Sequence, residues 1–234
     1  MASQHDCARA LLLSLALAAA VMLPGAEPAK QPPSPPASTN TVRFTPPKTK
    51  ALGLKRQVNA GSRAGTQQAA FPVALVPDGL GLTSTQQPVL WWFLSQPTTA
   101  KTEFTLNRSF ETLIKVELPA ALGAGIQKVD LASLAKDVSV KLASGAPYEW
   151  TVRIKQGDDP AAHPITVGWI EYRPLEGGLK IKAATASAAQ QPVLFASEGY
   201  WYDAVTLLAT PKPSPQLQPL LRQVGLTNVV VTGR

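Results

Sequence analysis

The segment EGYWYDAVTLL, residues Glu198–Leu208, decides the fold together with LQPLLRQVGL, residues Leu217–Leu226. In the first segment, three aromatic residues and an acid stand beside an apolar run with helical spacing. The second segment has the same spacing and ends at Gly225. Two short amphipathic helices are therefore predicted near the C-terminus, and they close a chain whose earlier residues alternate as strands do.

The body of the chain, residues 71–173, is predicted to be a set of short strands. Apolar and polar residues alternate there, which places one face of each strand on a core and the other in water. The predicted strands are Phe71–Val76, Pro88–Ser95, the stretch around Phe104 and Leu106, Phe110–Leu118, Val138–Leu142, Tyr148–Lys155 and Ile165–Tyr172. Turn residues such as Asp78-Gly79 connect them, and no helical crossover intervenes. The pattern is typical of a mainly β protein with an antiparallel, immunoglobulin- or fibronectin-like β-sandwich.

Residues 174–234 are predicted to form a small helical region, a C-terminal α-helical hairpin packed on the sandwich. Pro192 suits a first helical turn, and Gly199 suits the turn to a second helix over residues 200–210. A third helix is predicted to begin at Ser214 and Pro215 and to end at Gly225. The β-branched stretch Val229–Val231 is predicted to add an edge strand.

The N-terminus predicts export. Arg9 precedes the apolar run Ala10–Leu23, which Pro24 and Gly25 interrupt, as in a secretory signal peptide over residues 1–26. A bilayer span needs about 20 apolar residues, so no transmembrane span is expected after signal cleavage. The only cysteine, Cys7, precedes this run, so the exported chain has no disulfide and no lipid-anchoring thiol. The expected location is the periplasm or the extracellular space.

Residues 27–70 are predicted to be a disordered linker that is rich in proline and basic. They carry seven basic residues against one acid, a net charge of +6, whereas residues 71–234 carry 14 basic and 13 acidic residues. Such a composition buries too little apolar surface to fold alone. The linker either keeps the domain clear of the membrane or attracts anionic lipids or wall polymers. Because the folded part is nearly neutral, no nucleic-acid partner is expected.

Several stretches resemble a family of bacterial exported proteins known as domain of unknown function 928. They are Ala74–Thr83 (ALVPDGLGLT), Leu90–Leu94 (LWWFL), Tyr148–Trp150, Gly168–Glu171 (GWIE), Gly199–Ala204 (GYWYDA) and Leu220–Leu226 (LLRQVGL). They occur in the family's order over residues 73–230. The resemblance implies the fold and the exported location, and it implies no catalytic residue.

A search for catalytic chemistry finds no signature. The exported chain has one histidine, His163, which excludes a histidine-rich metal site, and no nucleophile or phosphate-loop motif is present. Glu149, Glu171 and Glu198 are candidates for a carboxylate-dependent hydrolase, although outward strand glutamates are usually solvated. Asp158 and Asp159 could bind calcium, but a local backbone contact is the commoner role of a turn acid. We expect no catalytic residue, cofactor or metal.

The aromatic residues are the remaining candidates for a site. Trp91 and Trp92 are neighbours in a strand and must face opposite sides of it. Packing is the ordinary role of such rings, and an exposed platform for sugars or a partner is the alternative. The candidate interaction surface comprises Trp91, Trp92, Tyr200, Trp201, Tyr202 and Asp203.

The sequence thus favours a non-catalytic interaction module, located in the envelope or secreted, that binds an envelope protein or a cell-wall polymer. The alternatives are a hydrolase or a carbohydrate-binding module acting on a surface polymer, and the oligomeric state stays open.

Overall fold

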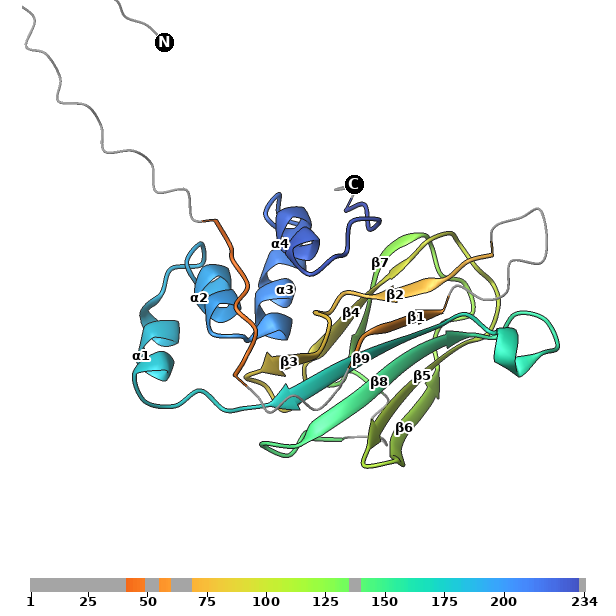
Figure 1. Ribbon diagram of the computed structural model, residues 1–234, viewed down its shortest axis with the longest axis horizontal. Coiled ribbons are helices and arrows are strands. Elements are labelled where there is room, and N and C mark those ends of the chain that lie inside the picture. The colour runs from red at the N-terminus through yellow and green to blue at the C-terminus, as the bar shows by residue number, and fades with distance from the viewer. Residues whose placement is uncertain (1–40, 49–54, 60–68, 135–139, 232–234) are drawn as a thin grey trace, which may run out of the picture. The chain divides into compact units, whose positions relative to one another are not determined.

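The computed structural model describes residues 41–48, 55–59, 69–134 and 140–231. This part of the chain is mainly β, with two sheets and four short helices (Figure 1). The strands are β1 (Gln57–Asn59), β2 (Pro72–Ala74), β3 (Leu80–Thr83), β4 (Val89–Leu94), β5 (Thr102–Arg108), β6 (Glu111–Glu117), β7 (Gly125–Asp130), β8 (Pro147–Ile154) and β9 (Ile165–Tyr172). The helices are α1 (Gly177–Thr185), α2 (Gln191–Ser197), α3 (Trp201–Ala209) and α4 (Leu217–Gln223), with a 3₁₀ turn, η1 (Pro160–Ala162).

The larger sheet has the strand order β1-β9-β8-β5-β6, and β3 joins it beside β9. The smaller sheet has the order β2-β4-β7. Among the strands of the described residues, every pairing is antiparallel except that of β3 with β9, where Leu80 lies opposite Trp169 in a parallel register. The prediction of a wholly antiparallel arrangement was therefore wrong, and β3, which follows the predicted turn at Asp78-Gly79, was not predicted as a strand. The finer assignment to an immunoglobulin- or fibronectin-like sandwich stays a prediction.

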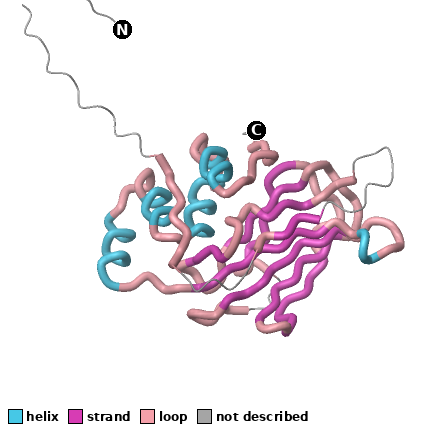
Figure 2. The backbone as a smooth tube through the Cα atoms, viewed as in Figure 1, coloured by secondary structure: helices cyan, strands magenta, loops and turns pink. Residues whose placement is uncertain are grey.

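Of the helices, α3 lies beside β3 and β4, and α2 and α4 lie beside α3 (Figure 1), with all helices at one side of the sheets (Figure 2). Side chains from both sheets and all four helices are buried in one hydrophobic cluster, which includes Trp92, Trp150 and Trp201. The predicted helices near Pro192 and over residues 200–210 correspond to α2 and α3. None of the described helices combines the length and hydropathy that a bilayer crossing requires.

The predicted linker, residues 27–70, was wrong where the structure describes it. β1 pairs with β9, and Val42 is a member of the hydrophobic cluster at 2% exposure. The Phe44 ring packs edge-on against Trp201 with the ring centroids 4.8 Å apart, and the Gln223 side chain pairs with the backbone of Val42 and Phe44. The prediction rested on the average composition of residues 27–70, in which these few apolar residues are outnumbered by proline and polar residues. Residues 27–40, 49–54 and 60–68 of the predicted linker lie outside the described residues.

Other boundaries also differ from the prediction. β7 and α1 were not predicted, and α4 begins at Leu217 rather than near Ser214. In the predicted strand Val138–Leu142, residues 140–142 carry no strand, and the others lie outside the described residues. Val229–Val231 forms no edge strand, because the Gln218 side chain bonds to the Val229 carbonyl (2.8 Å) and the Val231 N–H (2.9 Å) in place of a neighbouring strand.

Gly168 on β9 provides a test of the packing between β8 and β9. A Cβ atom there would lie 2.5 Å from Cε2 of Trp150. We expect Gly168→Ala to lower the free energy of unfolding by about 1–3 kcal/mol, because the indole must shift inside a packed core. Urea unfolding followed by tryptophan fluorescence measures this effect. The matched control is Gly178→Ala in α1, where no atom lies within 4 Å. An equal effect of the two substitutions would contradict the packing.

Candidate functional site

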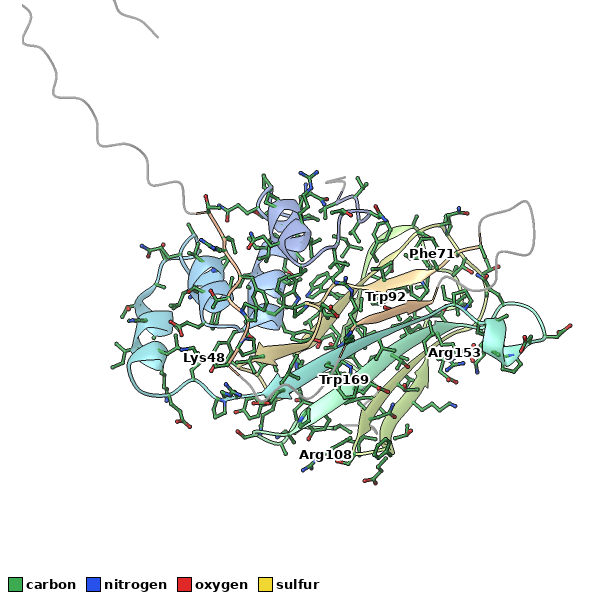
Figure 3. The ribbon with its side chains drawn as sticks, viewed as in Figure 1. Lys48, Phe71, Trp92, Arg108, Arg153 and Trp169 are labelled. Atoms are coloured by element: carbon green, nitrogen blue, oxygen red, sulfur yellow. The ribbon has the colours of Figure 1, made fainter. Side chains whose placement is uncertain are left out.

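The aromatic residues that the sequence proposed as an interaction surface lie in the core. Their exposed fractions are 7% for Trp91, 0% for Trp92, 4% for Tyr200, 0% for Trp201 and 2% for Tyr202. The prediction of an exposed platform is therefore wrong for these five rings, because two sheets and four helices cover them. Figure 3 shows Trp92 among the strands of the smaller sheet. Of the six candidates, only Asp203 is not fully buried, and its side chain is still mostly covered.

The start of α3 is held against the larger sheet by a buried network that we call the aromatic corner, formed by Trp150, Trp169, Trp201, Tyr202 and Asp203. The Trp201 indole donates to the Leu75 carbonyl at 2.7 Å. The Tyr202 hydroxyl accepts from the Trp150 indole at 2.8 Å and donates to the Trp169 carbonyl at 3.0 Å. Burial raises the pKa of Tyr202, and the Trp150 hydrogen bond only partly opposes this, so the hydroxyl stays protonated. The indole N–H groups of Trp150 and Trp201 and the hydroxyl of Tyr202 thus have their hydrogen-bond partners within the protein.

Asp203 joins α3 to the segment that follows β3. Its carboxylate accepts hydrogen bonds from the Ser84 backbone N–H at 2.9 Å and from the Ser84 hydroxyl. Burial raises the pKa of Asp203, although the bonds from Ser84 and Thr83 oppose that rise. The carboxylate also borders a cavity of about 250 Å³ between α3 and the start of β4, most of whose lining is apolar. Asp203 thus links the first turn of α3 to the segment after β3 through hydrogen bonds.

The carboxylates proposed for hydrolysis are engaged by other side chains or by solvent. The register of β8 and β9 sets Glu149 opposite Trp169, two residues from Glu171, but Glu149 receives a hydrogen bond from the Asn107 amide at 3.3 Å, and Glu171 is paired with Arg173. Glu198 is exposed at the end of α2. Asp159 accepts from the Ala161 N–H at 2.9 Å and caps η1, which confirms a local backbone role. Among the described residues, no group of three or more metal-ligating side chains occurs.

A different set of side chains forms a groove on the outer face of the larger sheet. This sheet groove has a volume of about 530 Å³ and is lined by Glu103, Thr105, Lys115, Thr151, Arg153, Lys155, Pro160 and His163. Phe104, Leu106, Trp150 and Val152 are buried on the opposite face, so alternation directs the intervening residues outward. In Figure 3, Arg153 lies close to η1, at the end of the sheet away from the helices.

Polar contacts fix the floor of the sheet groove. The hydroxyls of Thr105 and Thr151, which are opposite each other on β5 and β8, are 2.6 Å apart. Glu103 is bound by Lys155 at 3.0 Å and lies 3.4 Å from Lys115. Partial burial opposes ionisation of Glu103, but the hydrogen bond from Lys155 and the charge of Lys115 outweigh it and lower the pKa of Glu103. The carboxylate is therefore ionised at neutral pH.

The η1 loop closes one end of the sheet groove. Arg153 donates to the Pro160 carbonyl at 3.4 Å, and the His163 ring lies 3.3 Å from the Gly157 carbonyl. His163 is partly buried there. Sequence analysis missed the groove because its residues come from β5, β6, β8 and a loop. The alternation on each strand was visible, but the pairing of β5 with β8 was not.

A family model matches residues 56–232 and is described as Domain of Unknown Function (DUF928). The chain belongs to this family. The match confirms the resemblance seen in the sequence, and it begins before residue 71, in agreement with the place of β1 in the larger sheet. No curated protein matches the chain. The motif stretches of the family supply the aromatic corner, whereas most of the sheet-groove side chains lie outside them.

The raised pKa of Asp203 predicts a pH dependence of stability. The unfolded-state pKa of an aspartate is about 3.9, and the folded-state pKa of Asp203 lies above it. The protonated carboxyl therefore contributes its full stabilisation below the unfolded pKa, and this contribution is lost as pH rises through the folded pKa. We therefore expect the stability of the wild type relative to Asp203→Asn to be greatest near pH 3 and to fall above about pH 4. Urea unfolding at a series of pH values measures this difference.

Ser84→Ala provides the matched comparison for Asp203. It removes a donor that favours the ionised carboxylate and so raises the folded-state pKa of Asp203 further. The loss of stability is therefore expected to begin at the same pH as in the wild type but to continue to a higher pH. A difference between wild type and Asp203→Asn that is flat with pH would contradict the burial of this carboxylate.

Proposed function

We propose that this protein is an exported, non-catalytic module that binds a polar polymer of the cell envelope in the sheet groove. The observation that carries the proposal is the groove itself, where hydroxyl, carboxylate and basic side chains converge from three neighbouring strands. Its volume of about 530 Å³ falls within the range of ligand sites. Side chains fixed on strands offer a surface of constant spacing, which suits a repeating ligand.

Binding without turnover is supported by the chemistry of the lining. Glycoside hydrolysis uses two carboxyl groups, one of which acts as an acid with a raised pKa. Glu103 is the one carboxylate among the described residues that line the groove, and its pKa is lowered. An ionised carboxylate held by two lysines is an acceptor of hydrogen bonds rather than a proton donor.

The export part of the proposal rests on the N-terminal sequence. Replacing Leu13 in the apolar run by Arg is expected to leave the full-length chain in the cytoplasm, because a charge interrupts the signal. Leu13→Ile keeps the run apolar and serves as the matched control. Cell fractionation with mass analysis is expected to find the control exported and shortened near residue 26. Export of Leu13→Arg at the control level would contradict this part of the proposal.

Filling the groove tests the binding site. We expect Thr105→Phe to weaken co-sedimentation of the protein with insoluble envelope polysaccharide by about tenfold, because the ring occupies the floor and removes a hydroxyl. The control is Thr112→Phe, which makes the same change on β6 at an exposed residue outside the groove lining. Thermal unfolding of both variants checks that they fold.

Two results would overturn the proposal. One is unchanged binding by a folded Thr105→Phe variant, which would place the site elsewhere. The other is release of soluble sugar by the wild type that is lost in Glu103→Gln, which would make the groove catalytic.

A further inference from the structure

We infer that the ligand of the sheet groove is an acidic polysaccharide whose carboxylates meet Arg153 and the lysines while its hydroxyls meet Glu103 and the threonines. This inference rests on the proposed function and names the ligand class of the same site.

The charges of the sheet groove favour an anionic ligand. Its lining has three basic side chains, Lys115, Arg153 and Lys155, and one acidic side chain, Glu103. Glu103 engages both lysines, and two positive charges remain over the groove. Residues 71–234 have 14 basic and 13 acidic residues in all, so outside the groove lining they have 11 basic and 12 acidic residues and are nearly neutral. The excess charge is therefore a local feature of the groove.

Arg153 has the capacity to bind a carboxylate. Its guanidinium carries five N–H donors, and the hydrogen bond described for it is a long one, 3.4 Å, to the Pro160 carbonyl. A guanidinium binds a carboxylate through two parallel hydrogen bonds, which gives both affinity and orientation. Arg153 lies opposite Glu103 in the β5–β8 register, so a ligand acid bound by Arg153 lies beside the groove floor.

The floor distinguishes a polysaccharide from other polyanions. Glu103 accepts hydrogen bonds and has none to donate, so it suits sugar hydroxyls and repels a ligand with a charge at every position. The hydroxyls of Thr105 and Thr151 both donate and accept. Nucleic-acid strands are bound chiefly through stacking on large aromatic rings as well as charge, and among the described residues that line the groove there is no Phe, Tyr or Trp. A chain that carries hydroxyls throughout and acid groups at intervals fits this lining.

The test compares hyaluronate, which has a carboxylate on every second sugar, with its neutral methyl ester. Titration calorimetry of the exported full chain is expected to give binding of hyaluronate that is about tenfold tighter than that of the ester. Raising the salt concentration is expected to weaken only the binding of the acid. Arg153→Gln is expected to weaken hyaluronate binding by about tenfold, while the control Arg222→Gln, exposed on α4, leaves it unchanged.

Partly esterified pectin, polyphosphate and poly(U) complete the comparison. Binding of both acidic polysaccharides with the expected dependence on Arg153 supports the inference. Binding of neither one overturns it, as does tighter binding of polyphosphate or poly(U), which would indicate a phosphate ligand. Equal affinity for hyaluronate and its ester, both abolished by Thr105→Phe, would overturn the acidic ligand and leave the proposed function intact.

Discussion

The burial of the Tyr202 hydroxyl is the constraint on which the rest of the structure depends. A hydroxyl without partners in a core costs about 1–3 kcal/mol, so this one must both accept and donate. It accepts from the indole of Trp150 on β8 and donates to the backbone of Trp169 on β9. The Tyr202 side chain thereby holds α3 against two paired strands, because both hydrogen bonds form only when the helix lies at the right distance and orientation relative to β8 and β9.

That constraint explains the glycines around it. A Cβ atom at Gly81 would lie 2.9 Å from the ring of Tyr202, and one at Gly168 would lie 2.5 Å from Trp150. The backbone must approach the rings closely for their polar atoms to meet, and only glycine allows this approach. The stretches by which the chain resembles the family are therefore used here chiefly for packing, because their aromatic residues lie in the core.

Much of the fold could be predicted because its elements are local. The alternation at Tyr148–Lys155 and the helical spacing after Tyr200 each reside in consecutive residues, and β8 and α3 form there. β3 could not be predicted, because its four residues become a strand only when β9 supplies a parallel edge. The prediction of an exposed tryptophan surface was wrong for a related reason. The Trp91 indole donates a hydrogen bond to the Thr206 hydroxyl, and these two residues are 115 positions apart in the sequence. The sheet groove required the β5–β8 register, which likewise no local pattern contains.

The division between a fixed interior and a polar outer face bears on how the sheet groove can bind. Adjacent strands are about 4.8 Å apart, and side chains on one face of a strand repeat every two residues, so the polar groups stand at set intervals. Glu103 is held by lysines on both sides, on β6 and β8, which reduces the rotamer freedom that those side chains would lose on binding. The cost of ordering the site is thus largely met when the sheet forms. In the proposed mode of binding, each repeat of a polymer contributes weakly, and affinity grows because several repeats of one polymer are linked.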